Sequence, residues 1–306
     1  MVLNKEIFMK KFSIVFAPAA IARGHLRTED IYIKNLSAFD RSSRLKTNRK
    51  INDLEFLEFI SEQARDWSAG EEEKISGIMF PINSAFSEYN MFFPEEIIFI
   101  KTTGLEEGNA AYCRGNNVIV LPIDHINYPA DGLYDIIVHE LFHIFSRNNS
   151  KVQETLYGLL SFKKCDELRL PGEIFQRKIT NPDAAVNNYF FPSKINERDF
   201  NLMPLLLASS EYDEQKGCGF FDYMELYFIA VRDNGDTTVP LIQDNGFFLF
   251  TVDQVPDYLR LAGGNTDYII HPEEVLAGNF VLLIKKIDNL PDMEIIEKMK
   301  AILKAS

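Results

Sequence analysis

Residues 136–145 read IIVHELFHIF, and they lie in an apolar run without Gly or Pro that begins at Leu133, so we expect one buried helix there. On a helix, His139 and His143 lie on the same face and can direct ring nitrogens at one metal ion. Glu140 follows about 100° further round the helix, where it reaches a metal-bound water without being a ligand. This spacing predicts a zinc site: the metal lowers the pKa of the water to ~7, and Glu140 accepts its proton as the water attacks a carbonyl.

The apolar flanks of this motif favour a true metal site. A chance His-Glu-x-x-His is expected mostly on an exposed, polar helix, whereas here it would bury two imidazoles and a carboxylate at a cost of several kcal/mol. Metal coordination removes that cost. The metzincin continuation is excluded, because Ser146 and Asn149 stand where that pattern has a Gly and a third His.

The third zinc ligand has three glutamate candidates. Glu274 begins an apparent helix 131 residues after His143, and polar neighbours beside an apolar stretch suit a partly buried site there. Pro272 and two acidic residues would also begin an ordinary surface helix. Glu154, eleven residues after His143, lies in a polar context typical of an exposed turn and helix start. We favour Glu274, with Glu273 as the fallback.

The segment that begins at Glu274 reads Glu-x-x-Ala-Gly, which resembles the gluzincin pattern Glu-x-x-Ala-Asp. In that family the Glu ligates zinc and the Asp supports a ligating His, so the resemblance implies a zincin-like metallopeptidase in which Gly278 replaces the Asp. Over residues 90–285 the chain is also similar to a group of bacterial zincin-like proteins. The similar segments are Thr102–Gly104, Ala110–Arg114, His139–Arg147, Thr180–Asp183 and Tyr268–Glu274.

Other residues are candidates for substrate contact. In zincins a strand edge near the zinc helix pairs with the substrate backbone, and Ala110-Ala111-Tyr112 resembles such a strand, although it is equally compatible with an interior strand. Tyr268 and His271 are candidate donors to the oxyanion that forms on the scissile carbonyl, although a tyrosine near a helix start is commonly just packed.

Three further groups have a structural and a functional interpretation. Arg147 is either a helix cap or the partner of an acid near the site. The sequence Asn181-Pro182-Asp183 is typical of a turn, and contact with substrate is its second interpretation. The run Phe220-Phe221-Asp222-Tyr223 is either core or a shelf for an apolar ligand.

The composition excludes several classes of protein. The 306 residues are 46% apolar and 25% charged, which is enough for a full core. A formal charge of −13 disfavours nucleic acid and anionic membranes as partners, and leaves a peptide, a protein or a small molecule. The apolar runs are too short to span a bilayer. Three cysteines without a Cys-x-x-Cys pair fit a reducing, cytoplasmic location.

A secretory signal is the alternative to that location. From Met9 the chain has two lysines, an apolar stretch from Phe12 to Ala22 and an Ala-x-Ala ending. The interruption at Pro18 favours instead a buried strand over Phe12–Phe16 followed by a turn.

Periodicity predicts the neighbouring elements. We expect helices over 52–68 and 71–92, the second interrupted at Pro81, and a helix start at His271-Pro272. Strands are expected at 97–101, 110–113 and 118–121, with a hairpin between the last two. Residues 165–220 look like long irregular connections, and 220–231 and 246–251 are compatible with strand or helix.

These observations predict an α+β protein with a zincin-like fold: a small mixed sheet, an active-site helix and a C-terminal helical lobe. We expect one domain over residues 1–306, with lobes 1–147 and 148–306, the second of which returns Glu274 to the site. The predicted activity is zinc-dependent hydrolysis of a peptide or related amide. A non-catalytic zincin-like protein that binds a partner, and a metal-free binding protein, remain the alternatives.

Overall fold

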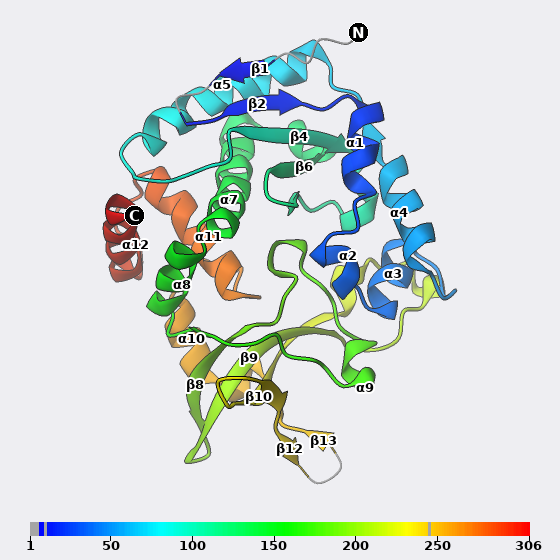
Figure 1. The fold of residues 1–306 in the computed structure, drawn as a ribbon, viewed down its shortest axis with the longest axis vertical. Coiled ribbons are helices and arrows are strands. Elements are labelled where there is room, and N and C mark those ends of the chain that lie inside the picture. The colour runs from blue at the N-terminus through cyan, green and yellow to red at the C-terminus, as the bar shows by residue number, and fades with distance from the viewer. Residues whose placement is uncertain (1–5, 9–10, 244–245) are drawn as a thin grey trace.

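The fold is α+β and contains two main sheets, one flanked by helices in the upper part of Figure 1 and one in its lower part. The computed structural model describes residues 6–8, 11–243 and 246–306. Its α-helices are α1 (Ala19–Leu26), α2 (Ile31–Asn35), α3 (Ala38–Arg44), α4 (Asp53–Glu62), α5 (Ala69–Phe86), α6 (Ile123–Ile126), α7 (Ala130–Asn148), α8 (Ser150–Leu159), α9 (Gly172–Phe175), α10 (Pro256–Ala262), α11 (Pro272–Ile284) and α12 (Met293–Ala305). Short 3₁₀ turns are η1 (Leu105–Glu107), η2 (Pro182–Ala184), η3 (Glu214–Lys216), η4 (Phe220–Tyr223) and η5 (Val252–Gln254).

The first sheet belongs to the N-terminal part of the chain and has the order β1-β2-β4-β6-β5, with β3 paired to β4. Its strands are β1 (Glu6–Phe8), β2 (Ser13–Phe16), β3 (Ala64–Arg65), β4 (Glu96–Thr102), β5 (Tyr112–Arg114) and β6 (Val118–Pro122). Strands β2, β4 and β6 are parallel, whereas β5 runs antiparallel to β6 at the edge. The predicted hairpin at Gly115-Asn116-Asn117 is confirmed, and Gly115 has the positive φ of 54° that such a turn favours.

Helices cover both faces of this sheet. Alternate residues of β4 enter two different cores: Ile97 and Phe99 face α5, α7 and α11, whereas Ile98 and Ile100 face α1, α2 and α4. Burial on both faces explains why β4 and β6 read as continuous apolar runs.

The second sheet belongs to the C-terminal part and has the order β11-β10-β9-β8-β7, with β14 also paired to β10. Its strands are β7 (Lys163–Lys164), β8 (Tyr189–Ile195), β9 (Arg198–Ala208), β10 (Met224–Asp233), β11 (Thr238–Pro240) and β14 (Leu249–Thr251), and β12 (Ile242–Gln243) pairs with β13 (Gly246–Phe247) beside it. The prediction of irregular structure over 165–220 is therefore wrong for 189–208, where two long strands form a hairpin.

Several predicted boundaries need correction. The helix expected over 52–68 ends at Glu62, and the chain then enters β3. The helix expected to break at Pro81 continues through it as α5 and ends at Phe86. Residues 220–231 form η4 followed by β10, and 246–251 form short strands.

The stretch weighed as an export signal is part of the fold where the structure describes it. Phe12 to Phe16 is buried and contains β2, which lies between β1 and β4, and α1 begins at Ala19. Met9 and Lys10, which belong to the same interpretation, lie outside the described residues.

The lobes of the predicted division share one core. The largest apolar cluster joins β4 and α7 from the first segment with β8, α11 and α12 from the second. Among the helices that the structure describes, none has the length and apolar character needed to cross a bilayer.

Candidate metal centre

Helix α7 supplies the two histidines of the site. It extends the predicted helix over 133–147 by three residues at its start and one at its end, with Asp131 in its first turn and Arg147 in its last, where the helix dipole favours each charge. One face of α7 is buried against the first sheet and α11. His139 and His143 lie one turn apart, with ring centroids 4.7 Å from each other.

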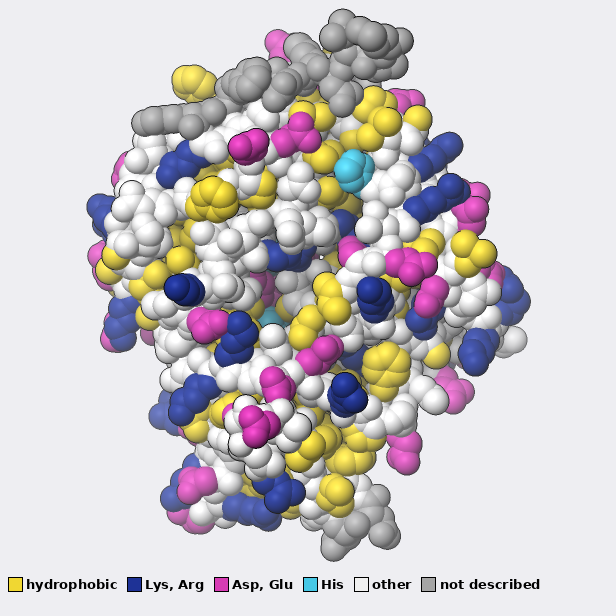
Figure 2. All heavy atoms as spheres, viewed as in Figure 1, with side chains coloured by type: hydrophobic (Ala, Val, Ile, Leu, Met, Phe, Trp, Pro, Cys, Tyr) yellow, Lys and Arg dark blue, Asp and Glu magenta, His cyan; other side chains and the backbone are white. Residues whose placement is uncertain are grey.

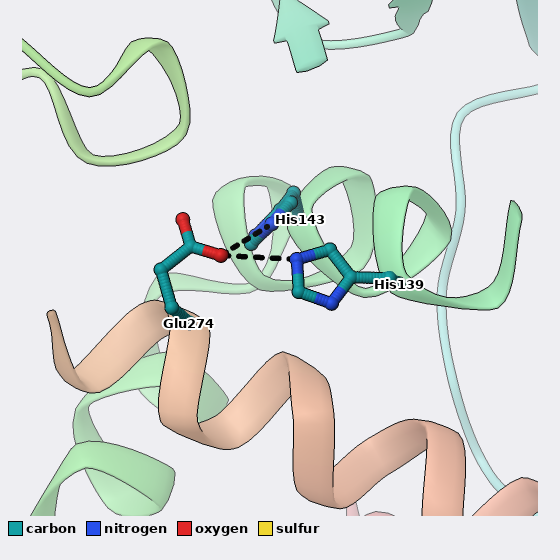
Figure 3. Close-up of side chains that lie close together, drawn as sticks. All are labelled: His139, His143 and Glu274. Atoms are coloured by element: carbon teal, nitrogen blue, oxygen red, sulfur yellow. Dashed lines mark hydrogen bonds and ion pairs between the residues drawn. The ribbon is translucent and has the colours of Figure 1, made fainter. Parts of the chain in front are cut away.

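Helix α11 brings Glu274 to these rings from the far end of the chain. Its N-terminus is fixed by His271, whose Nδ1 accepts the backbone N–H of Glu273, and by Pro272 at the first position. Oε2 of Glu274 lies 3.0 Å from Nε2 of His139 and 3.5 Å from Nε2 of His143 (Figure 3).

The three donor atoms fit a tetrahedral metal ion. Ligands about 2.0–2.1 Å from zinc at tetrahedral angles are about 3.3 Å apart, and the two distances to Glu274 lie on either side of that value. His143, His139 and Glu274 offer donor atoms that all lie within 4.8 Å of one another. Two imidazoles and one carboxylate are a ligand set that zinc takes at catalytic sites, with a fourth position open.

Glu273 orients His143 and is not placed as a ligand. Its Oε1 lies 3.1 Å from Nδ1 of His143, and its Oε2 accepts hydrogen bonds from Ser146 Oγ at 2.9 Å and Tyr157 Oη at 2.6 Å. A carboxylate on the second ring nitrogen holds the imidazole with Nε2 toward the metal position. Glu273 thus occupies the role that the resemblance assigned to an Asp at position 278.

An Asp at position 278 would press against Thr266. A Cβ on Gly278 would lie 3.1 Å from Oγ1 and 3.2 Å from Cβ of Thr266. The loop before α11 therefore packs where the supporting carboxylate would begin.

Asn181 orients the Glu274 carboxylate. Its Nδ2 donates to Oε1 of Glu274 at 2.6 Å, while its Oδ1 accepts the backbone N–H of Asp183 at 2.9 Å, which fixes the direction of the amide. The turn is anchored by Asp40, which accepts from both the backbone N–H and the hydroxyl of Thr180. Oε1 of Glu274 therefore already accepts a hydrogen bond, and Oε2 is the oxygen that faces the two histidines.

Glu140 is buried beside the histidines, as the motif predicts. Burial, and next the nearby Asp183 carboxylate, raise its pKa to about 7. Its Oε2 accepts a hydrogen bond from the Cys113 thiol at 3.3 Å. Desolvation opposes the charged form of His143, but Asp183 and Glu274 outweigh it and raise the pKa of that imidazole well above its usual range.

A cavity of about 450 Å³ opens on this cluster. The candidates from the sequence that lie on its wall are His139, Glu140, Glu274, Ala110, Ala111 and Tyr268, together with Asn181, Pro182, Asp183, Phe220 and Phe221. The ring centroid of Tyr268 is 6.3 Å from that of His139. In the face shown in Figure 2, a histidine side chain is visible at the bottom of a hollow near the middle, among charged side chains of both signs.

Two predicted site residues lie elsewhere. The side chain of Tyr112 is buried in the other core, 2% exposed, and its hydroxyl lies 3.4 Å from Glu106. His271 caps α11 outside the cavity wall, and burial lowers its pKa to about 4, so the ring is a neutral acceptor.

The predicted substrate-binding strand is shorter than expected. It begins only at Tyr112, and its outer edge is covered because the Cys113 N–H donates to Asp183 Oδ1 at 3.0 Å. Backbone available to a substrate before the strand is thus confined to the Ala110 carbonyl and to Ala111, because the Ala110 N–H donates to the Glu107 carbonyl at 3.0 Å.

Glu154 is not near the histidines. Its carboxylate pairs with Lys164 at 2.6 Å, and its side chain is 44% exposed. The third-ligand alternatives therefore separate by geometry: Glu274 faces both histidines, Glu273 supports one, and Glu154 contacts neither ring.

Sequence reasoning missed the role of Asp183 and Cys113. With Glu140, they form a second cluster of donor atoms within 4.8 Å, next to the histidines. Asp183 also lies 3.5 Å from Arg147, which makes the acid-pairing interpretation of Arg147 the better one. The Asn-Pro-Asp turn was the available signal, but nothing in its sequence indicated that it would fold back onto α7.

Compared with protein-family models, curated proteins and solved structures, the chain matches none of them.

Proposed function

We propose that this protein is a zinc-dependent hydrolase of a peptide or related amide bond, with a zincin-like arrangement of sheet and zinc helix. One observation carries the proposal: Nε2 of His139, Nε2 of His143 and Oε2 of Glu274 converge at a cavity, while Glu140 lies beside them. The oriented carboxylate and imidazole argue for a built metal site, because the second polar atoms of His143 and Glu274 already have partners.

Zinc, when bound there, supplies Lewis acidity that polarises the scissile carbonyl and lowers the pKa of the attacking water. Glu140 then accepts a proton from that water and passes it to the leaving amine. Tyr268, on the same cavity wall, is our candidate for the group that donates a hydroxyl hydrogen to the developing oxyanion. Backbone at Ala110 and Ala111 is available to align the substrate.

The edge of the first sheet supports the zincin-like interpretation. Strand β5 is antiparallel at this edge and packs directly against α7, where the Cys113 thiol donates to the backbone carbonyl of Glu140 at 3.3 Å. A substrate strand laid along Ala110–Ala111 would continue that edge past the metal position.

A glycine in place of Asp at position 278 would favour a non-catalytic protein only if no other carboxylate supported a ligating histidine. That alternative rested on the absence of a carboxylate behind a ligating histidine, and Glu273 supplies one to His143. The metal-free alternative keeps one point in its favour, because a protonated His143 between Glu273 and Glu274 would form ion pairs without any metal.

Two measurements test the proposal. Elemental analysis of dialysed protein should find about one zinc per chain, and the zinc-loaded protein should cleave members of a peptide library. Glu140→Gln should keep the zinc and lose hydrolysis, whereas the matched surface variant Glu154→Gln should keep both. Protein without metal would support the ion-paired alternative, and zinc without cleavage the non-catalytic one.

A further inference from the structure

We infer that the substrate presents a large apolar side chain next to the scissile bond, and that this side chain rests on an aromatic shelf formed by Phe220 and Phe221. The inference builds on the proposed hydrolysis, because the shelf lines the same cavity as His139 and Glu274.

The cavity wall beside the metal position is mainly apolar. Its apolar side chains come from η4, β9, β10 and the loops before α11 and η2, as well as from α7 and α11. They are Ile136, Ile179, Leu206, Phe220, Phe221, Met224, Ile270, Val281 and Leu282. A cavity of about 450 Å³ whose exposed wall is mainly apolar, with the histidine and glutamate groups of the metal position on it, suits an apolar group that carries a reactive polar end.

The shelf is held rigidly from behind. The rings of Phe220 and Phe221 lie 4.1 Å apart by their centroids, and the Arg44 guanidinium lies 4.3 Å from the Phe220 centroid. Gly108 backs both rings so closely that a Cβ there would come within 2.9 Å of each. A preformed aromatic surface costs little ordering on binding, which favours affinity for an apolar side chain.

The charges near the shelf are already paired. Arg44, the one Lys or Arg on the described cavity wall, donates to Asp40, to both oxygens of Glu107 and to the Thr180 carbonyl. An acidic substrate side chain would therefore find no unpaired Lys or Arg at the shelf, and Glu107, which already pairs with Arg44, is not free to pair with a basic one. Burial of such a charge without a partner is costly, so the same surface that favours an apolar group rejects a charged one.

Peptide hydrolysis provides the first test. Fluorogenic peptides that differ only at one residue beside the scissile bond, Phe or Leu against Asp, Lys or Gly, should differ at least 10-fold in kcat/KM in favour of Phe and Leu. Phe221→Ala should reduce the preference for Phe over Gly several-fold without changing zinc content. Phe92→Ala removes an exposed ring that is not part of the cavity wall and should leave the preference unchanged; Phe92 is 67% exposed and Phe221 41%.

Binding of hydroxamates separates this inference from the hydrolase proposal. Zinc-loaded protein should bind the hydroxamate of phenylalanine at least 10-fold more tightly than that of aspartate, measured by calorimetry, whether or not any peptide is cleaved. Preferential binding without cleavage would overturn the hydrolase proposal and keep the shelf. Cleavage without apolar preference, or an equal loss for all substrates in Phe221→Ala, would overturn the shelf.

Discussion

Three variants, each with one glutamate replaced by glutamine, should rank the candidate third ligands by how much each substitution weakens zinc binding. Glu274→Gln removes the only carboxylate oxygen that faces both histidines in the described site. Glu273→Gln leaves the three donors in place but removes the charge behind His143. Glu154→Gln changes an exposed ion pair and is the matched control. We expect the loss of affinity to follow this order.

The magnitudes follow from the position of each carboxylate. Zinc binds structural sites with a free energy of about 10–16 kcal/mol, which is about 2.5–4 kcal/mol for each of four ligands. Loss of one ligand in Glu274→Gln should therefore raise the Kd for zinc by two to three decades. For Glu273→Gln we expect about 10–100-fold, the usual effect of a supporting partner, because a glutamine offers one acceptor oxygen to the three donors that now share two. Glu154→Gln should change the affinity by less than about twofold.

Zinc competition against a chromogenic chelator measures all three constants under one condition, and circular dichroism of each metal-free variant checks its fold. A 100-fold loss in Glu154→Gln with little change in Glu274→Gln would refute the ligand assignment. Equal losses in Glu273→Gln and Glu274→Gln would refute the distinction between support and ligation.

Three other substitutions test the surroundings. Asn181→Ala should weaken zinc binding about 10-fold by releasing Oε1 of Glu274, and an unchanged Kd in chelator competition would contradict that role. Gly278→Asp, which introduces the Asp of the gluzincin pattern, should lower the melting temperature without improving zinc affinity because of contact with Thr266; a tighter Kd would contradict the role given to Glu273. Glu106→Gln should stabilise the protein more at pH 8 than at pH 4. Burial raises the pKa of Glu106 from 4.5 to about 7. Between these two pH values the carboxyl group is ionised in the unfolded chain but still protonated in the folded protein, so its contribution to the free energy of unfolding falls by about 3 kcal/mol as the pH rises. Urea unfolding at both pH values measures this difference, and a pH-independent one would contradict it.

The local elements of the site were predictable because their signals are local. The uninterrupted apolar run identified α7, and Pro272 with two acids identified the start of α11. Helical periodicity places residues four apart on one face whatever the rest of the chain does. The parallel pairing of β2, β4 and β6 was not encoded in this way, because it depends on crossovers through helices.

Long-range partners were not predictable for the same reason. The hairpin of β8 and β9 was missed because Pro192, Pro204 and two asparagines interrupt its pattern, and tertiary packing overrides that weak propensity. Asn181 looked like turn chemistry and is that, but its amide also reaches Glu274, 93 residues away. Tyr112 faces the opposite core because neighbouring residues of β5 point to opposite faces of the sheet, and Cys113 takes the face toward α7.

The charge balance around the histidines gives a physical reason to expect a cation there. Glu140, Glu273 and Glu274 are 4%, 2% and 2% exposed, and the side chain of Asp183 is 6% exposed. Arg147 is the one Lys or Arg among the described residues with a carboxylate oxygen of this group within ion-pair distance, and its contact with Asp183 is a long 3.5 Å. Four buried carboxylates cannot all be ionised against one guanidinium without a large desolvation cost, so a metal-free cluster must retain protons. A divalent cation between the two imidazoles and Glu274 would offset that excess negative charge at its centre, and its binding should therefore release protons to the solvent.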